Sequence, residues 1–557
     1  MERLLGIALT ALAWLVPPPV LPIPSRSGVE GPPRPFTATP RSGPTPARTR
    51  PGIARSQSRA MLYGPFPAGG LVRGISDGVL LESAGPETRA LALARIRATG
   101  ATVVRIPVDW RELVSSGPPA GFDPADPADR AYRFARLDEA VRSAASAGLV
   151  PILVVSHAPD FAEAPDRWPF AYRGSWAPSP EALQAFAQAL GRRYDGSFPD
   201  PRTPGRALPA VKDFQAWNEP NLARYLEPQW VAEAGHWTAF SPLLYRQLLN
   251  AFYAGVKQVA PNDVVIAAGI APDGDPSGVG RMAPITFLTS LLCLRGGPHP
   301  ARAPCPDPPH FDVLAFHPLS VGDPDRPAAS SLDVSIADAA KVTHLLRRAE
   351  ALGTALPAGP KPVWATELNW ESAPQSPRGV APGLQARWTS RALHRLWIAG
   401  VGLVDWQFLV DPYPALRVAG PTGEGVEYQR AAGLYSAGPG GNLELAQPKP
   451  FLAGFTFPFD PLRARAERVR VWALLPPGQQ TALVQFARTV QGRWHTLKLL
   501  RAGPSGVLNV LVRMRAGAVL RLVSGALVSP AASVPAGHRA SARQVASRGP
   551  GHTRTRE

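Results

Sequence analysis

Val363-Trp364-Ala365-Thr366-Glu367 is one of eight short runs, rich in β-branched and aromatic residues, that recur along the middle of the chain. Longer segments with apolar residues at every third or fourth position lie between these runs. Strands that alternate with helices in this way predict an α/β protein with a parallel sheet and crossover helices. Eight such units predict a (β/α)8 TIM barrel, with strands at residues 71–76, 102–107, 150–155, 213–217, 264–269, 313–316, 363–366 and 402–406.

The 557-residue chain changes in composition on both sides of this expected barrel domain, residues 61–460. Short alternating runs at 465–535, separated by turns, predict a small all-β sandwich module. Residues 26–60 are rich in Pro and Arg and predict a disordered linker, and residues 536–557 predict a disordered basic tail.

Residues 1–25 contain an apolar run from Leu4 to Val16 behind Arg3. This run is typical of a signal peptide and is too short to span a bilayer. We find no other stretch apolar and long enough for a stable membrane span. We therefore expect an exported protein, either secreted or associated with the cell envelope, and take a monomer as the default.

The formal net charge of +17 does not predict a nucleic-acid partner. Residues 1–60 and 536–557 carry net charges of +6 and +4, and only six of the 59 basic residues are lysines. The positive charge is therefore concentrated at the two ends, and no nucleic-acid-binding motif accompanies it. Adhesion to a surface through these Arg-rich ends is a weaker alternative.

Cys293 and Cys305 are the only cysteines of the chain, and they flank a loop rich in Pro and Gly. In an exported chain we expect a disulfide that closes this loop, worth on the order of 3 kcal/mol by loop-closure entropy. Two unpaired thiols are the alternative. A zinc site is disfavoured, because the loop offers only His299 as a further ligand.

Polar residues stand at the carboxyl ends of most of the expected strands. In a (β/α)8 barrel these ends meet at one mouth, so polar side chains there indicate chemistry. The candidates are Arg105, His157, Asn218, Glu219, His317, Glu367 and Trp406.

Glu219 and Glu367 end the fourth and seventh expected strands, which face each other across the mouth. Two carboxyl groups on either side of a sugar-sized gap are what cleavage of a glycosidic bond requires. One must be protonated to donate to the leaving oxygen and the other ionised to attack the anomeric carbon, so their environments must differ. We expect Arg105 to keep Glu367 ionised and Asn218 to hydrogen-bond a sugar 2-hydroxyl.

Trp217-Asn218-Glu219-Pro220-Asn221, followed by Thr366-Glu367, resembles the clan A glycoside hydrolases, in particular family 5 (cellulase-type) and family 39-like members, over about residues 70–460. The resemblance implies a retaining double displacement on β-glycosidic bonds of a carbohydrate substrate, with Glu219 as acid/base and Glu367 as nucleophile, and with no cofactor. It also implies supporting roles for Arg105, His157, Asn218, His317 and Trp406. We expect Trp406 to stack on the first sugar.

Leu319 departs from the family 5 pattern, which places a tyrosine two residues after the strand-six histidine, in contact with the nucleophile. Tyr413, after the eighth strand, is a candidate to support the nucleophile instead. Leu319 also keeps open a second hypothesis, a cell-surface carbohydrate-binding protein with weak or no catalysis. A metal site is not expected, because the sequence has no His-x-x-x-His or His-Glu-x-x-His spacing to support one.

Overall fold

The computed structural model describes residues 70–114, 117–297, 299–320, 322–413, 417–419, 425–427, 431–465 and 467–534. The expected signal peptide, linker and basic tail lie outside the described residues. Among the residues that are described, no helix combines the length and the apolar character that a membrane span needs.

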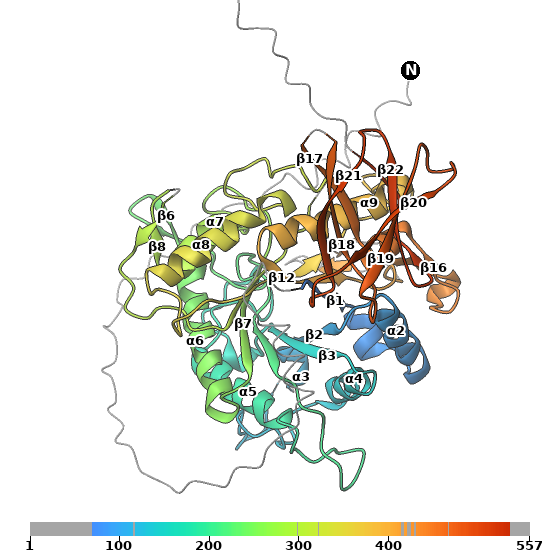
Figure 1. Cartoon of the computed structure of the whole chain (residues 1–557). Helices are drawn as coiled ribbons and strands as arrows, with labels where there is room; N and C mark the ends of the chain where they lie inside the picture. The colour runs from blue at the N-terminus through green and yellow to red at the C-terminus, as the bar shows by residue number, and fades with distance from the viewer. Residues whose placement is uncertain are drawn as a thin grey trace, which may run out of the picture.

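Eight parallel strands close into a barrel, as the sequence predicts (Figure 1). Neighbours around the ring follow the order β1-β12-β11-β10-β7-β4-β3-β2, so strands successive along the chain lie side by side and the last pairs with the first. Each of the eight expected runs forms one of these strands. They are β1 Val72–Ser76, β2 Val103–Asp109, β3 Val150–Ser156, β4 Asp213–Ala216, β7 Val264–Ile270, β10 Val313–Phe316, β11 Val363–Leu368 and β12 Val401–Gln407.

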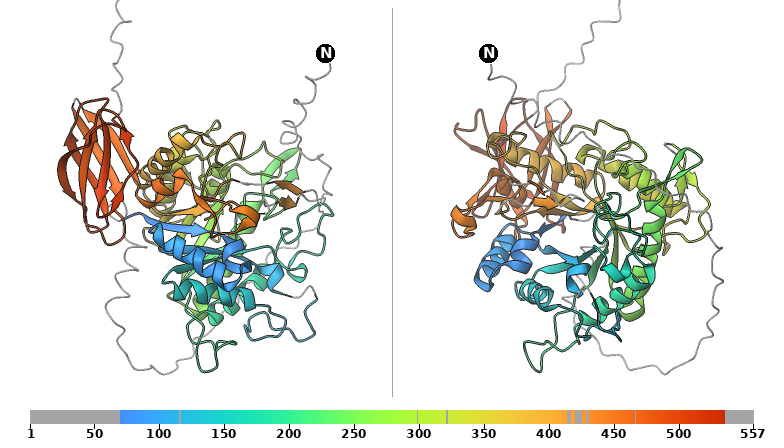
Figure 2. Two further views of the ribbon diagram at one scale, coloured as in Figure 1. Left: turned by 90° about the vertical axis from the view of Figure 1, so that its right-hand side faces the viewer. Right: turned by 180° about the vertical axis from the view of Figure 1, so that it is seen from behind.

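Helices surround the barrel as an outer layer (Figures 1 and 2). Several begin with Pro in their first turn, where the missing N–H costs nothing, and the Ser179 side chain caps α5 by accepting from the backbone N–H of Ala182. The helices are α2 Pro86–Ala98, α3 Trp110–Leu113, α4 Ala135–Ser146, α5 Pro180–Arg193, α6 Ser241–Val259, α7 Pro284–Leu291, α8 Ala339–Ala351, α9 Pro382–Ile398 and α10 Pro450–Thr456.

Side chains alternate between the inside and the outside of the barrel along each strand. The inward residues form their own buried cluster, separate from the larger core between strands and helices. Below the mouth the barrel interior is therefore packed, so chemistry is confined to the strand ends. The inner cluster consists of Val103, Ile152, Val264, Ile266, Val313, Ala315, Trp364 and Leu403.

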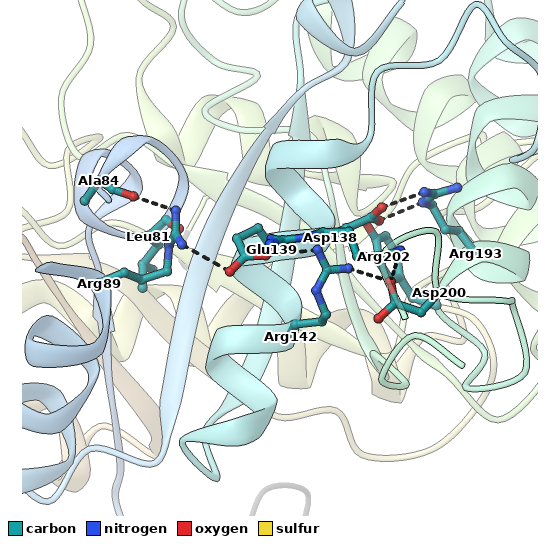
Figure 3. Close-up of polar contacts among 10 residues, drawn as sticks. Leu81, Ala84, Arg89, Asp138, Glu139, Arg142, Arg193, Asp200 and Arg202 are labelled. Atoms are coloured by element: carbon teal, nitrogen blue, oxygen red, sulfur yellow. Dashed lines mark hydrogen bonds and ion pairs between the residues drawn. The ribbon is translucent and has the colours of Figure 1, made fainter. Parts of the chain in front are cut away.

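Ion pairs connect α4 to the neighbouring helices α2 and α5 (Figure 3). The Asp138 carboxylate accepts two hydrogen bonds from Arg193 of α5, at 2.8 and 2.6 Å. Glu139 lies 3.4 Å from Arg89 of α2, and Arg142 also pairs with Glu139, at 3.0 Å. Since the Asp138–Arg193 pair is buried and bidentate, it fixes the orientation of α4 against α5.

The chain after the barrel forms two antiparallel sheets that share a buried core, which confirms the expected all-β sandwich. It lies beside the barrel, as the left view of Figure 2 shows. The sequence pattern did not indicate its first strand, β17, which pairs with β18. The strands are β17 Phe459–Arg465, β18 Arg468–Leu474 and β21 Val507–Arg513 in one sheet, and β19 Thr481–Ala487, β20 His495–Arg501, β22 Val519–Ser524, β23 Leu527–Val528 and β24 Ala532–Ser533 in the other.

Helix α9 carries the contact between the barrel and this module. The His394 ring of α9 stacks on Trp472 of β18, with ring centres 4.5 Å apart. Asp460 of β17 lies 2.6 Å from Nδ1 of His394 and accepts a hydrogen bond from Arg391 at 2.8 Å. Trp472 is fully buried and belongs to the core of the barrel, so the module completes the packing around α9.

The predicted disulfide between Cys293 and Cys305 is confirmed. It closes a loop that contains a small hairpin, β8 Leu294–Arg295 paired with β9 Ala301–Arg302. Smaller two-stranded sheets, such as β5 Trp230–Glu233 with β6 His236–Ala239, also occur in the loops between the barrel elements.

Candidate active site

A backbone turn just after β4 brings Glu219 to the mouth of the barrel. Trp217 and Glu219 both have left-handed backbone conformations, with φ of 72° and 40°, which few non-glycine residues adopt. Trp217 is fully buried in the core between strands and helices. The Glu219 backbone N–H donates to the Gly269 carbonyl at 3.1 Å. Strain of this kind is common where a side chain must be held for function.

An irregularity in β11 brings Glu367 to the same place. Trp364 points into the barrel, so strict alternation would turn residue 367 outward. The pairing register between β11 and β12 shifts between Ala365 and Leu368, and a bulge of this kind re-aims a side chain. The Glu367 carboxylate consequently lies buried in the mouth, where it faces groups from other strands.

Arg105 of β2 holds this part of the mouth together. Its buried guanidinium donates to Glu367 at 2.8 Å, to the side-chain oxygen of Asn218 at 2.5 Å and to that of Gln215 at 3.2 Å. A buried charge is stable only when it is paired and its remaining hydrogen bonds are made, and this geometry meets both conditions. The ion pair with Arg105 therefore stabilises negative charge on Glu367.

His317 lies between the two carboxyl groups. Its Nδ1 is 2.9 Å from Glu219 and 3.6 Å from Glu367. One oxygen from each carboxyl group and this nitrogen all lie within 4.8 Å of one another. The two acidic residues, which are far apart in the sequence, are thus neighbours at one mouth of one closed barrel.

Burial gives Glu219 and His317 protonation states that suit a proton donor. Desolvation raises the pKa of Glu219 to about 7, against the opposing effect of Arg105 and Arg224. Desolvation lowers the pKa of His317 to about 4, so its ring is neutral at neutral pH. A neutral ring with Nδ1 facing carboxylates carries its proton on that nitrogen. Glu219 can therefore hold a proton near neutral pH while Glu367 is ion-paired.

His157, just after the end of β3, contacts Asp109 and Tyr225. Its Nδ1 is 3.0 Å from a carboxylate oxygen of Asp109, and its ring stacks on Tyr225 with centres 5.2 Å apart. Burial raises the pKa of Tyr225, and the nearby carboxyl groups of Glu219 and Glu367 raise it further. The sequence analysis missed Tyr225, which comes from the loop after β4.

Leu319 stands where the family 5 pattern places a tyrosine, and Tyr413 does not replace that tyrosine. The Tyr413 side chain is 59% exposed and lies against Gly441. Tyr225 is the phenol that lies near the two carboxyl groups in the described residues. The only signal in the sequence that could have indicated it is its place in the loop that follows Glu219.

The expectation that Trp406 forms a sugar platform is wrong. Trp406 is 0% exposed, and its ring lies 5.3 Å from that of Phe451 and 6.0 Å from that of Phe455 of α10. Leu403 points into the barrel, and alternation turns the residue three positions later outward. Trp406 consequently packs under the helices, where no sugar can reach it.

Asp405, the residue before Trp406, points into the barrel instead. It is fully buried, and neither of its oxygens makes a hydrogen bond within the described residues. Gly74 of the neighbouring strand leaves the space for it, since a Cβ at that position would lie 3.2 Å from the Asp405 carboxyl carbon. Burial raises the pKa of Asp405 well above its usual value, with Arg105 opposing this effect.

This pKa predicts that Asp405→Asn stabilises the protein at neutral pH. Above the ordinary pKa of an aspartate, the folded protein must either keep Asp405 protonated or bury its negative charge. In the unfolded protein Asp405 ionises in water without this cost. We expect the substitution to raise the melting temperature by about 2–4 °C at pH 7, with a smaller gain near pH 4. Thermal unfolding followed by circular dichroism at the two pH values measures this. A lower melting temperature at pH 7 would contradict it.

Glu219, His317 and Glu367 are also close enough to hold a metal ion. Arg105 and Arg224 place positive charge against the same carboxyl groups, and a cation would compete with both. The second ring nitrogen of His317, Nε2, makes no hydrogen bond within the described chain, whereas a metal-bound histidine normally has that nitrogen held. The set fits paired-carboxylate chemistry better than metal binding.

A cavity of about 690 Å³ lies beside the end of β2 and is also lined by α3 and the start of α4. It is lined by residues of both charges, among them Glu82, Asp109, Arg111 and Arg136. Asp109 lines this cavity, and its carboxylate also contacts His157. Its volume is in the range of small-ligand sites.

No protein-family model and no curated protein sequence matches the chain. Among solved structures it is similar to a family 39 glycoside hydrolase from Bacteroides cellulosilyticus WH2, at 15% identity and a TM-score of 0.44, covering 80% of this chain and 79% of the other. It is also similar to a monomeric β-xylosidase from Caulobacter crescentus CB15 (16% identity, TM-score 0.43, covering 84% and 97%). A third is a GH5_18 protein from Bifidobacterium longum subsp. infantis (14% identity, TM-score 0.41, covering 70% and 78%). The closed strand order of the chain itself establishes its barrel fold.

Proposed function

We propose that the protein is a retaining β-glycosidase that acts on a polysaccharide, oligosaccharide or glycoconjugate. The observation that supports this best is the distance between Glu219 and Glu367, which have oxygens within 4.8 Å of each other. Retaining enzymes hold their two carboxyl groups about 5–5.5 Å apart, and inverting enzymes hold them about 6.5–9.5 Å apart to admit a water molecule. The short distance favours direct attack by a carboxylate.

In the proposed first step, Glu367 attacks the anomeric carbon while Glu219 donates its proton to the leaving oxygen. The ion pair with Arg105 fixes the position of the Glu367 carboxylate. Asn218, whose side-chain oxygen is held by Arg105, presents its amide N–H to the sugar 2-hydroxyl, a contact that strengthens as positive charge develops on the ring. The products of this step are the free alcohol and a glycosyl ester on Glu367.

In the second step, Glu219 is a carboxylate and takes a proton from water, which attacks the anomeric carbon and releases Glu367. His317, neutral and close to both groups, donates to whichever carboxyl group is charged. Two inversions at the anomeric carbon leave the product with the configuration of the substrate.

We further propose that the protein is exported, because its substrates would be extracellular glycans. The apolar run from Leu4 to Val16 supports export. The Cys293–Cys305 disulfide supports it as well, since disulfides persist in oxidising compartments.

Proton NMR of the first product tests the proposed function. We expect hydrolysis of at least one member of a panel of β-glucan, β-mannan, β-xylan and aryl β-glycosides, with the β-anomer appearing first and then mutarotating. A chelator should leave the rate unchanged, as a control against metal catalysis. If the α-anomer appeared first, the retaining mechanism would be wrong; sugar binding without any hydrolysis would favour a carbohydrate-binding protein instead.

The pKa of Glu219 predicts how activity depends on pH. Glu219 must be protonated for the first step, and its pKa is about 7. The value of kcat/KM is therefore expected to fall about tenfold for each pH unit above 7. Initial rates at low substrate concentration between pH 4 and 10 measure this. A profile that stays flat to pH 9 would contradict the role of Glu219.

A further inference from the structure

Arg224 is a second arginine at the site, and none of the proposed steps uses it. It lies five residues after Glu219, in the loop between β4 and β5. Backbone hydrogen bonds hold this loop on both sides of it: Ala223 donates to Gly280 at 2.7 Å, and Tyr225 donates to Leu222 at 2.9 Å. The half-buried Arg224 is thus placed by a fixed backbone rather than by a partner for its charge.

The guanidinium of Arg224 lies over the ring of Tyr225, 5.4 Å from its centre. Tyr225 also stacks on His157, and its backbone carbonyl accepts a hydrogen bond from the indole of Trp217, two residues before Glu219, so its ring lies beside the site. A cation held on an aromatic face keeps its N–H groups free to bind something else.

Arg224 makes no hydrogen bond and no ion pair with any of the described residues. Three other arginines near the ends of the barrel strands are paired: Arg105 with Glu367, Arg111 with Asp160, and Arg281 with both oxygens of Asp275. A planar guanidinium offers five donors that suit a carboxylate or a sulfate. An unpaired one in the wall of a site is suited to an anionic group on the ligand.

Arg224 lies on the Glu219 side of the site. It comes from the same loop as Glu219, after β4, and it lies over Tyr225, which stacks on His157 at the end of the neighbouring strand β3. Glu367 belongs to β11, and β7 and β10 lie between β4 and β11 in the ring. Glu219 protonates the leaving oxygen in the proposed reaction, so a group on the Glu219 side faces the leaving unit.

We propose that Arg224 determines specificity by binding an anionic substituent, a carboxylate or a sulfate, on the leaving-group unit of the substrate. The natural substrate is then an acidic glycan or glycoconjugate. This inference rests on the proposed function, and it adds the chemical class of the substrate to it.

Three aryl β-glycosides of one accepted sugar test this proposal. Their leaving groups are 4-carboxyphenol, 4-sulfophenol and the neutral 4-carbamoylphenol. The measured quantity is kcat/KM for each anionic substrate divided by kcat/KM for the neutral one, which cancels any change in Glu219 that affects all three. The proteins compared are wild type, Arg224→Gln, Arg224→Lys and the matched control Arg281→Gln, whose arginine lies in the adjoining loop and is already paired with Asp275.

We expect Arg224→Gln to lower at least one of the two ratios about 10- to 100-fold, as loss of a charged hydrogen bond does. Arg224→Lys should keep part of the preference, and Arg281→Gln should keep all of it. The ratio that falls identifies whether the group recognised is a carboxylate or a sulfate, and 0.5 M salt should reduce it in the wild type.

Two further outcomes separate this proposal from the function on which it rests. Hydrolysis of all three glycosides with both ratios unchanged in Arg224→Gln would overturn the role of Arg224 and leave the glycosidase intact. A wild-type protein that hydrolyses no β-glycoside would overturn the proposed function, and the assignment of Arg224 with it.

Discussion

Glu367→Gln is expected to lower kcat/KM by on the order of 10⁴-fold or more, because the amide keeps the shape of the nucleophile but cannot form the glycosyl ester. The loss should appear with every substrate, activated or not, since the first step needs the nucleophile in all cases. Steady-state rates with an aryl glycoside and with the natural type of substrate measure it.

Two controls separate loss of chemistry from loss of structure. Glu367 is paired with the buried Arg105, so removing its charge also leaves a buried cation without its partner, which costs about 3–5 kcal/mol. Melting temperature and circular dichroism must therefore show that the variant is folded at the assay temperature. The matched variant is Glu371→Gln, four residues later, where the carboxylate hydrogen-bonds Ser376 instead of Arg105; it should keep nearly full activity.

A small external nucleophile extends this test. In Glu367→Ala the space of the carboxylate is open, and azide is expected to attack the anomeric carbon and give a glycosyl azide of inverted configuration. Such rescue requires that the missing group is the nucleophile. Wild-type activity in Glu367→Gln would contradict its assignment, and so would failure of azide to restore turnover in a folded Glu367→Ala protein.

Glu219→Gln is expected to show a loss that depends on the leaving group. For an alkyl or sugar leaving group, which needs a proton, kcat/KM should fall about 10²–10⁴-fold. For a dinitrophenyl leaving group, which departs without a proton, kcat/KM should change by less than about tenfold, while the second step becomes slow. The fall of activity above pH 7 should disappear, because the group that titrates there is gone.

Glu227→Gln is the matched control for this result. Burial raises the pKa of Glu227 to about 7 as well, but its carboxyl group contacts Ser175 in a neighbouring loop and not His317. The alkaline decline should therefore persist in Glu227→Gln. If the decline persisted in Glu219→Gln and vanished in Glu227→Gln, Glu219 would not be the acid/base.

The barrel could be predicted from the sequence because the pattern of a short apolar run followed by a helical segment is repeated along the chain. Eight apolar runs separated by helical segments leave few other architectures, and all eight form strands. Strand β17 of the sandwich was missed because Phe459-Asp460-Pro461 mixes a charge and a proline into the run, which weakens the alternating pattern. Its Asp460 is buried against His394 and Arg391, a partnership that sequence does not reveal.

The site was predictable where residues end strands and not where the backbone departs from regularity. Glu219 and Glu367 were both expected at the mouth, but each arrives there through an irregular backbone, the left-handed turn after β4 and the shift in β11. The prediction for Trp406 is wrong because alternation along β12, and not closeness to the strand end, decides which way this side chain points. Because Leu403 points into the barrel, alternation along the strand places Asp405 inside and Trp406 outside.

Residues on loops could not be assigned from the sequence. Tyr225 and Arg224 reach the site because the chain after Glu219 folds back over the strand ends, anchored by bonds such as that from the Trp217 indole to the Tyr225 carbonyl, 2.7 Å long. Nothing in the spacing of these residues distinguishes them from other polar residues in long loops.

Trapping of the intermediate tests the central claim most directly. A 2-deoxy-2-fluoro glycoside with a dinitrophenyl leaving group slows the second step more than the first, so the glycosyl ester accumulates. Peptide mass spectrometry of the inactivated protein is expected to find one added fluorosugar, on Glu367, and none in Glu367→Gln. A label on any other carboxylate, or hydrolysis of the natural substrate without a covalent adduct, would contradict a double displacement at this pair of residues.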